Sequence, residues 1–292
     1  MCIPKDLPID PTVPLAAVCP TVTAFYGNAR SFRQASGEFC QQITDCDADI
    51  WAITESHLKD DPVTMMIPSG YNVVSRRDRS KHGGGILLGA KKHLLCNPLD
   101  LKKYNIPNIA ELDGFELHDV YYIACYTPNS IHTAILIDMI TKFLIDHPGA
   151  KVVLMGDFNC HNREWLHSTV PTDIAGTCVQ EFCETFGLSQ YVDFPTRGRN
   201  TLDLIMSTFT GKAEPLPNLG SSDHISISFT CQVEDRLPDA PHASAVFNWH
   251  KAPWSHTRGA VKRSLVIWND SDYESPDEVS TRLPANHLGA RS

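Results

Sequence analysis

The sequence predicts an α/β or α+β protein in which packed β-sheets are covered on the outside by helices. Short apolar runs rich in β-branched and aromatic residues alternate with segments whose apolar residues recur at helical spacing. One of these runs, KVVLM at 151–155, is typical of a buried strand. The chain has 292 residues, of which 42% are hydrophobic, and this is enough to bury the core of one large domain or two small ones.

The elements are expected in a mixed order along the chain. We expect strands at 21–26, 49–54, 71–76, 83–90, 121–128, 151–158, 201–206 and 224–229, and helices at 32–44, 133–146 and 177–186. The segment AILIDMITKFLIDH at 134–147 spaces its apolar residues for a helix buried on one broad face, and the following Pro-Gly ends it. We interpret this helix as scaffold.

The two ends of the chain differ in composition from the middle. Five prolines in the first twenty residues predict a mobile leader over 1–20, so the folded domain is expected over 21–232. From 233 to 292 we expect a polar, proline-bearing linker, a short basic segment with Trp249 and Trp254, and a disordered tail.

Composition excludes several classes of protein. No stretch approaches the roughly 18 consecutive apolar residues of a membrane-spanning helix, and the N-terminus lacks the pattern of a signal peptide. We therefore expect a soluble protein that is not secreted. The ten scattered cysteines are expected to be reduced thiols, because they form no C-x-x-C pair. A net charge of −9 argues against binding nucleic acid through bulk charge, so any such binding has to be local.

Polar side chains gather at the ends of the predicted strands, where a rigid scaffold presents reactive groups. They are Glu55, Asp157, Asn159, Asp223 and His224, together with Asp203 inside the apolar run TLDLIM. Each one alone has an ordinary explanation as a surface residue, a cap or a buried hydrogen-bond partner. Carboxylates that converge from several strand ends without a thiolate cluster instead suit a hard cation such as Mg²⁺ or Mn²⁺.

Other catalytic motifs are absent from the sequence. It contains no G-x-S-x-G, no G-x-x-x-x-G-K-[ST], no H-E-x-x-H and no G-x-G-x-x-G after a strand. The triplet Gly83 to Gly85 could cradle a phosphate, but it leads into an apolar run, and we favour a flexible entry into a strand.

These motifs, in this order, resemble the endonuclease/exonuclease/phosphatase superfamily. The resemblance covers residues from about 21 to 231 and rests on a set of short motifs. They are Asn28 in YGNARSF, Glu55 in ITESHL, Tyr126 in CYTPN, Asp157 and Asn159 in GDFN, Asp203 in TLDLI, and Asp223 with His224 in SSDH. It implies a four-layered, DNase I-like α/β sandwich of two mixed sheets flanked by helices, with the active site at one end of the sheets.

The resemblance also implies roles for these residues. Glu55 and Asn28 would hold Mg²⁺, for which Mn²⁺ can substitute, and Asp223 would be a candidate ligand for a second metal. The catalytic residues would be Asp157 for the attacking water, Asn159 for orientation, Tyr126 for a phosphate oxygen, and His224 for the phosphate, oriented by Asp203. Such an arrangement agrees with phosphodiester hydrolysis, in which a protein mainly positions water and stabilises charge.

One departure and two further resemblances indicate the branch that contains the endonucleases of LINE-type (non-LTR) retrotransposons. Repair endonucleases that act on abasic sites carry an Asp two residues after the motif Asn, where this chain has Arg30. The stretch GDFNCHNREW, with His161, and the Trp-rich basic segment after 233 also resemble that branch. Since no F/Y-x-D-D reverse transcriptase signature is present, we expect an N-terminal endonuclease piece, truncated or separately encoded.

Contacts to DNA are expected from local patches. These are Arg79 and Lys81 in RRDRSKH, Thr196, Arg197 and Arg199 in TRGRNT, and Arg30 and His161 beside the motifs. An ordinary solvated loop is the alternative for each patch, and loop packing is the alternative for His161.

The function that follows is a Mg²⁺-dependent endonuclease that nicks double-stranded DNA and leaves a 3′-hydroxyl to prime reverse transcription. We expect a monomer that acts in the nucleus, with no membrane association and with the reverse transcriptase module of the same element as a potential partner. Three alternatives stay open: an abasic-site repair endonuclease, a phosphatase or sphingomyelinase of the same superfamily, and an inactive remnant that only binds DNA or a partner.

Overall fold

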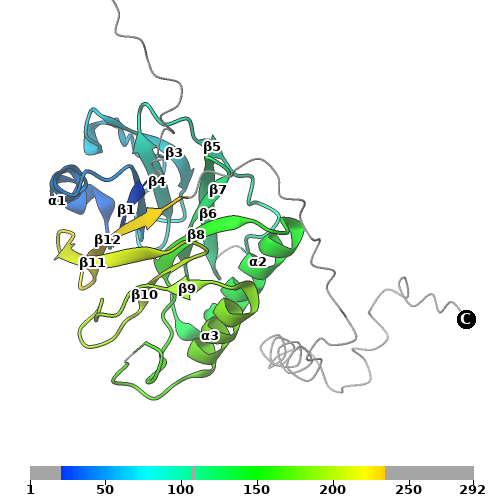
Figure 1. The fold of residues 1–292 in the computed structure, drawn as a ribbon. Coiled ribbons are helices and arrows are strands. Elements are labelled where there is room, and N and C mark those ends of the chain that lie inside the picture. Colours follow the sequence, from blue (N-terminus) through cyan, green and yellow to red (C-terminus); the bar gives the residue numbers. More distant parts are fainter. Residues whose placement is uncertain (1–20, 107–108, 167, 234–292) are drawn as a thin grey trace, which may run out of the picture. The chain divides into compact units, whose positions relative to one another are not determined.

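The computed structural model describes residues 21–106, 109–166 and 168–233. The leader expected over 1–20 lies outside these residues, as do the linker, the Trp-bearing basic segment and the tail expected after Val233. Two mixed β-sheets form the centre of the described part (Figure 1). No helix within this part is long and apolar enough to cross a membrane.

Each sheet combines parallel and antiparallel neighbours. The first sheet has the order β11 (Gly211–Asn218), β12 (Ile225–Gln232), β1 (Thr21–Asn28), β2 (Ile50–Thr54), β4 (Ile86–Lys91) and β3 (Tyr71–Arg77). The second has the order β5 (Asn97–Pro98), β6 (Glu111–Leu117), β7 (Val120–Tyr126), β8 (Lys151–Asp157), β10 (Asp203–Ser207) and β9 (Ser189–Gln190). The parallel pairs are β1 with β2 and β7 with β8.

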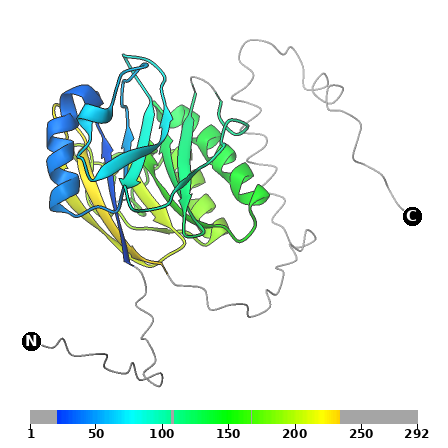
Figure 2. The ribbon, with the colours of Figure 1, turned by 90° about the horizontal axis from the view of Figure 1, so that it is seen from above.

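Three helices cover the outer faces of the sheets. Helix α1 (Phe32–Asp45) packs on the first sheet, and α2 (Thr133–Asp146) and α3 (Ile174–Phe186) pack on the second, as Figure 2 shows from above. Two short 3₁₀ helices, η1 (Thr64–Met66) and η2 (Ser130–His132), lie in connections. The layers are therefore helix, sheet, sheet and helices, and the predicted four-layered fold class is confirmed.

Side-chain alternation along the strands builds this layering. On β7, Tyr122 and Ala124 point into the core between the sheets, whereas Ile123 and Cys125 point into the core under α2 and α3. Because successive side chains of a strand face opposite sides, a strand buried on both faces has to be apolar throughout. This explains why the runs YYIACY and KVVLM have so few polar residues.

The expected elements are present with small shifts at their ends. Helix α3 begins three residues before the expected start, because Asp173 caps it with a hydrogen bond from the backbone N–H of Gly176 at 2.6 Å. Gly83 to Gly85 directly precede β4, as expected for a strand entry. Strands β5, β6, β9 and β11 were not predicted. The four buried cysteines of the described part, Cys125, Cys160, Cys183 and Cys231, are free thiols, as predicted.

The topology brings the ends of several strands from both sheets to one side of the molecule. Strands β1, β2, β7 and β8 end on this side, while β10 and β12 begin there because each runs antiparallel to a neighbour, β8 or β1. The polar residues that follow or precede these strands in the sequence therefore meet at one place.

Candidate active site

A row of polar side chains crosses the second sheet on this side of the molecule. The register pairs Tyr126 with Asp157 and Asp157 with Asp203, so residues from β7, β8 and β10 lie side by side. They occupy the same alternate positions as the residues of the core between the sheets, so the three side chains point towards the first sheet. Asp157 and Asp203 are both fully buried, with 1% and 0% of their surfaces exposed.

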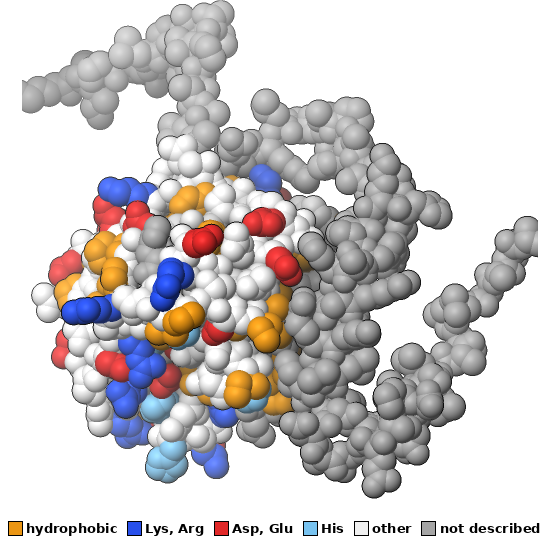
Figure 3. Space-filling model, turned by 90° about the horizontal axis from the view of Figure 1, so that it is seen from below, with side chains coloured by type: hydrophobic (Ala, Val, Ile, Leu, Met, Phe, Trp, Pro, Cys, Tyr) orange, Lys and Arg blue, Asp and Glu red, His pale blue; other side chains and the backbone are white. Residues whose placement is uncertain are grey.

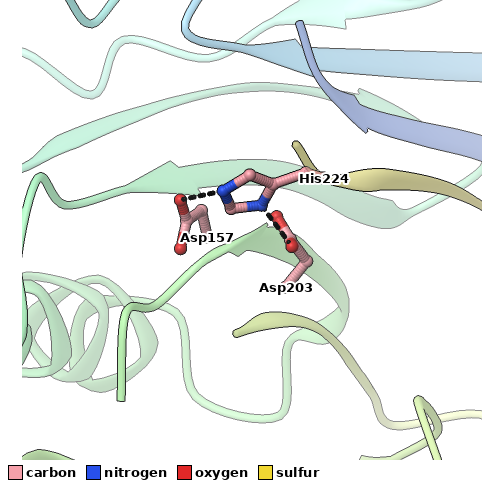
Figure 4. Close-up of side chains that lie close together, drawn as sticks. All are labelled: Asp157, Asp203 and His224. Atoms are coloured by element: carbon pink, nitrogen blue, oxygen red, sulfur yellow. Dashed lines mark hydrogen bonds and ion pairs between the residues drawn. The ribbon is translucent and has the colours of Figure 1, made fainter. Parts of the chain in front are cut away.

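The imidazole of His224 lies between these two carboxylates (Figure 4). Its Nδ1 is 2.7 Å from Asp203 Oδ2, and its Nε2 is 3.9 Å from Asp157 Oδ2. From the first sheet, the Tyr26 hydroxyl donates to the other oxygen of Asp203 at 3.1 Å. Asp203 is thus held on both sides, and it fixes the orientation of the His224 ring.

Charge and burial set the protonation of this group. Burial lowers the pKa of His224, but the charge of Asp203, the hydrogen bond to it and the charge of Asp157 raise that pKa to about 9. Burial and the charge of Asp203 raise the pKa of Asp157. At neutral pH the ring is therefore an imidazolium, a hydrogen-bond donor at both nitrogens, and it compensates the charge of two buried acids.

Asp157, Asp203 and His224 also form a group with spacing that could hold a metal ion, since their ligand atoms lie within 4.8 Å of one another. This group differs from the expected ligands Glu55 and Asn28. The His224 Nδ1 is engaged by Asp203, and a protonated ring offers no lone pair to a metal. We therefore interpret the three residues as one charged unit, in which His224 forms a hydrogen bond with Asp203 and a longer ion pair with Asp157.

Asn28 connects this unit to Glu55. Its Nδ2 donates to Asp157 Oδ2 at 3.0 Å and to Glu55 Oε1 at 3.3 Å. Its carbonyl oxygen Oδ1 is buried and has no hydrogen-bond partner in the described part of the chain. Glu55 follows β2 directly with a left-handed backbone (φ 49°), and its other oxygen lies 3.3 Å from His57 Nε2. A buried unpartnered oxygen beside a carboxylate is a suitable donor set for a hard cation.

Asn159 and Tyr126 complete the polar row. Asn159 has a left-handed backbone (φ 46°), and its N–H donates to Asp157 Oδ1 at 3.1 Å. Its side-chain Nδ2 donates to the carbonyl of Thr127 at 2.8 Å. Burial and the nearby charge of Glu55 raise the pKa of Tyr126, so its hydroxyl keeps its proton and remains a donor. Strained backbone of this kind is common where side chains have to be aimed at a ligand.

Asp223 lies on the rim of the site and is bound by two arginines. Arg30 Nη1 is 3.2 Å from Asp223 Oδ1, and Arg197 Nε is 2.8 Å from Asp223 Oδ2. Partial burial opposes the change, but the Arg197 guanidinium lowers the pKa of Asp223. Both oxygens of this carboxylate thus face guanidinium groups, and a second-metal role for Asp223 would require it to leave them.

The other predicted DNA-contact residues divide into buried and exposed ones. Thr196 is buried, and its hydroxyl oxygen accepts the backbone N–H groups of Leu202 and Asp203, both at 3.0 Å, which suits a role in holding the loop. Arg79 is partly buried, and its Nη1 donates to Glu111 at 3.2 Å. Lys81, Arg197 and Arg199 are exposed.

His161 is partly buried and is tied into its own loop. Its Nδ1 is 2.9 Å from the Ser168 hydroxyl, and its backbone N–H donates to Asp173 at 3.1 Å. Of the two readings that the sequence left open for this residue, loop packing agrees with these contacts.

The surface carries charge in a mixed pattern. On the face shown in Figure 3, Lys and Arg side chains lie beside acidic and histidine side chains and form no unbroken basic area. Arg30, Asp223 and Arg197 are an example of such mixing. This face therefore offers no continuous basic area that could bind nucleic acid through bulk charge.

Two residues of the site region were missed from the sequence. Tyr26 lies in the run TVTAFY, where an aromatic residue is expected in any strand, and nothing marks its hydroxyl as a partner for Asp203. Glu111 pairs in register with Tyr126 and so extends the polar row by one strand. The alternation of polar and apolar residues in ELDGF is compatible with a strand, but it predicts that the acids face solvent, whereas Glu111 and Asp113 are buried.

Two mixed sheets packed face to face between helices, with a polar site where strand ends of both sheets meet, define the endonuclease/exonuclease/phosphatase fold. The protein of Bacteroides thetaiotaomicron described as an endonuclease/exonuclease/phosphatase family protein has this fold. It matches with a TM-score of 0.51 and 13% identity, over 73% of this chain and 97% of that chain.

Within this fold the chain is similar to the endonuclease domain of TRAS1, a telomere-specific non-LTR retrotransposon. The TM-score is 0.57 with 17% identity, over 74% of this chain and 100% of that domain. An AP endonuclease from Archaeoglobus fulgidus matches with a TM-score of 0.52 and 15% identity, over 71% of this chain and 98% of that chain. Residues 120–228 match the sequence model of a family described as endonuclease-reverse transcriptase. No curated protein matches the sequence. The predicted resemblance is confirmed.

Proposed function

We propose that this protein is a Mg²⁺-dependent endonuclease that hydrolyses phosphodiester bonds of double-stranded DNA. The observation that carries the proposal is the continuous network from Glu55 through Asn28 to Asp157 and on to His224 and Asp203. It joins an oxygen-rich cation site, a buried carboxylate and an imidazolium through hydrogen bonds and one ion pair. Such a combination promotes phosphodiester hydrolysis by activating water and stabilising charge.

Glu55 and Asn28 are the residues that would hold the cation. The unpartnered Asn28 Oδ1 and the carboxylate of Glu55 supply hard oxygen ligands, which Mg²⁺ prefers and for which Mn²⁺ can substitute. A Mg²⁺ ion held there would supply positive charge that stabilises the negative charge developing during cleavage of the phosphodiester. We propose a single cation, held by Glu55 and Asn28. Both oxygens of Asp223, the candidate ligand for a second metal, already bind arginines.

Asp157 is the proposed base. Its raised pKa makes it a better proton acceptor than an ordinary carboxylate, and Asn28 and the Asn159 backbone N–H fix its two oxygens. We assign it the proton of the attacking water. Asn159, held by the Thr127 carbonyl, orients Asp157 and the phosphate.

His224 and Tyr126 are the proposed phosphate donors. With a pKa near 9, His224 is protonated at neutral pH and serves as an electrophilic partner for a phosphate oxygen, while Asp203 holds its ring. The Tyr126 hydroxyl, whose pKa is raised, donates to a second oxygen. These donors are in place before the charge develops, so they need little reorganisation during the reaction.

The biological role that we propose is the nicking of target DNA in a non-LTR retrotransposon. Cleavage that leaves a 3′-hydroxyl gives a primer, and a reverse transcriptase module of the same element would extend it in the nucleus. The match to the endonuclease-reverse transcriptase family and the similarity to the TRAS1 domain support this choice. Arg30, which stands where repair enzymes carry an Asp, favours it over repair of abasic sites.

The test is a nicking assay with the full chain. Supercoiled plasmid, an abasic duplex and a phosphoinositide are each incubated with Mg²⁺ or with EDTA, and the nicked ends are then offered to a DNA polymerase. We expect nicked plasmid only with Mg²⁺, and ends that the polymerase extends without further treatment. Glu55→Gln should abolish nicking, whereas Asp138→Asn, the same acid-to-amide change on the exposed face of α2, should leave it unchanged.

The other outcomes identify the alternatives. Strong preference for the abasic duplex would make the protein a repair-type endonuclease. Release of phosphate from the phosphoinositide alone would make it a phosphatase. Absence of nicking with every divalent ion tried, combined with retained DNA binding, would indicate an inactive remnant.

A further inference from the structure

Glu111 is a buried acid outside the residues assigned above, and it lies next to the site. It is the first residue of β6, pairs in register with Tyr126, and is only 5% exposed. A carboxylate at this depth requires hydrogen-bond donors, because burial without them is costly. Its two oxygens identify those donors.

The contacts of Glu111 cross from the second sheet to the first. Its Oε2 accepts the backbone N–H of Gly85 at 2.7 Å, and its Oε1 accepts from Arg79 Nη1 at 3.2 Å. Gly85 directly precedes β4, whereas Glu111 belongs to β6, so this bond ties the two sheets together on the side of the molecule that carries the site.

Gly85 and its neighbour Gly84 in turn hold the segment after β2 through backbone hydrogen bonds. The carbonyls of Gly85 and Gly84 accept the backbone N–H groups of Ser56 and His57, both at 3.1 Å. These are the two residues that follow Glu55, which has a left-handed backbone. A non-glycine residue keeps such a conformation only when its surroundings enforce it.

Only glycine fits at the two tied positions. Gly84 and Gly85 have φ values of 71° and 92°. A Cβ at Gly85 would lie 2.5 Å from the Ser56 hydroxyl, and one at Gly84 would lie 2.4 Å from Glu111 Oε1. The glycines are therefore packed directly against the side chains of Glu111 and Ser56, and a shift of the glycines would move the amides of Ser56 and His57 that their carbonyls accept.

We propose that Glu111 is a positioning residue for Glu55. Through its bond to Gly85 it fixes the backbone of the glycine pair, which fixes Ser56 and His57 and so aims the Glu55 carboxylate towards Asn28. The role in cation binding rests on the proposed function, whereas the mechanical role does not.

Three variants separate this role from a general effect on folding. Glu111→Ala removes both contacts. Glu111→Gln keeps an acceptor for the Gly85 N–H and loses only the ion pair with Arg79. Asp113→Ala is the matched control, because Asp113 is a buried acid on the same strand and is 6% exposed. Its hydrogen bonds are to the Ser75 hydroxyl at 2.6 Å and to the Gly114 N–H at 3.0 Å, and neither involves Gly84 or Gly85.

Hydrogen exchange of the residues after β2 measures the mechanical role without metal or DNA. In Glu111→Ala we expect the amides of Ser56 and His57 to exchange about tenfold faster or more, because their acceptors lose their support. Glu111→Gln should restore wild-type exchange, and Asp113→Ala should leave these amides protected although its global stability also falls. Unchanged exchange in Glu111→Ala, or equal acceleration in Asp113→Ala, would overturn the proposal.

Cation binding is the second readout. The Mg²⁺ concentration that half-saturates the rise in melting temperature should increase about tenfold in Glu111→Ala and stay within about twofold in the other two variants, as is usual for residues that orient a metal ligand. If Mg²⁺ fails to stabilise the wild type at all, the proposed function is wrong, while the exchange data still decide whether Glu111 holds the Glu55 turn. Exchange that changes without any change in Mg²⁺ affinity would limit Glu111 to the turn and refute its effect on Glu55 as a ligand.

Discussion

Asp157 and Asp203 lie opposite each other on neighbouring strands, and both are buried. Two carboxylates at this separation repel each other strongly in a medium of low dielectric constant. His224, between them, supplies the compensating charge, while the Tyr26 hydroxyl and the Asn28 amide supply hydrogen bonds. The protonation of one ring therefore links the stability of this edge of the sheet to the state of the site.

This link predicts how stability depends on pH. The pKa of His224 is raised from 6.5 to about 9 on folding, so its contribution is fully present below pH 6.5 and is lost as the pH rises to about 9. We expect the difference in free energy of unfolding between wild type and His224→Gln to shrink by on the order of 2–3 kcal/mol between pH 6 and pH 9.5. Urea unfolding at both pH values measures it. A difference that does not change with pH would show that the ring is not charged in the folded state.

Asp157 is expected to be costly for stability and essential for activity. Its pKa is raised by burial and by the charge of Asp203, so it stabilises the fold when protonated and loses that contribution as the pH rises above the ordinary range of a carboxyl. Asp157→Asn should therefore leave the free energy of unfolding at pH 7.5 equal to or above that of the wild type, whereas nicking should fall about 10³-fold or more. Thermal melts and plasmid assays on one preparation test both parts. A large loss of stability would mean that the lost activity reflects unfolding.

At the scale of elements, two helical glycines differ in their surroundings. Gly37 lies in α1, and a Cβ added there would meet nothing within 4 Å. Gly176 lies in the first turn of α3, where a Cβ would lie 2.1 Å from the His161 carbonyl. The loop that follows β8 thus packs directly on the start of α3, and the Asp173 cap holds both parts through the N–H groups of Gly176 and His161.

The same substitution should therefore have opposite effects in the two helices. Gly37→Ala is expected to stabilise the protein by about 0.5–1 kcal/mol, because alanine restricts the unfolded chain and favours the helix. Gly176→Ala is expected to destabilise it by about 1–3 kcal/mol, because the loop has to move away. Chemical unfolding of both variants decides this. Equal effects of the two changes would mean that the loop after β8 does not rest on α3.

The elements that the sequence predicted and those it did not differ in a physical way. Strands buried on both faces, such as β7 and β8, have no polar residues in their interior, so their pattern is unambiguous. Strand β6 was missed because Glu111, Asp113 and Gly114 interrupt its apolar residues, although tertiary partners satisfy both acids. Strand β11, with Pro215 and Pro217, lies at the edge of its sheet, where strands tolerate proline.

The residues of the site can likewise be divided into those that the sequence could predict and those that it could not. Glu55, Asp157 and His224 could be predicted as site residues from the sequence, because their motifs lie at strand ends. The topology does bring these strand ends together. The sequence could not predict that Asp223 binds Arg30 and Arg197, because side-chain pairing between distant loops leaves no local pattern. For the same reason the cross-sheet bond of Glu111 became visible only with the fold.

For the whole molecule, a net charge of −9 opposes the approach of DNA, so affinity has to come from the few cations on the rim of the site. Arg30 is exposed and close to Asp223, which lies in the loop before β12 and directly precedes His224. Lys142 is exposed on α2, which covers the outer face of the second sheet. Replacing either residue by Gln changes the net charge by one, from −9 to −10, yet only one of the two lies at the proposed site.

These two variants test whether binding is local or global. Arg30→Gln should weaken DNA binding whatever the sequence, and it should reduce the slope of log K against log salt by about one, the loss of one phosphate contact. Lys142→Gln should leave both affinity and slope within error of the wild type, since a charge on the far helix is screened beyond about 10 Å at 0.1 M salt. Fluorescence anisotropy with a labelled duplex, in EDTA to prevent cleavage and at several salt concentrations, measures both quantities. If the two variants weaken binding equally, net charge governs the encounter and Arg30 has no specific role in it. If only Arg30→Gln weakens binding, this acidic protein binds DNA, which is itself acidic, through a few guanidinium groups positioned at the site.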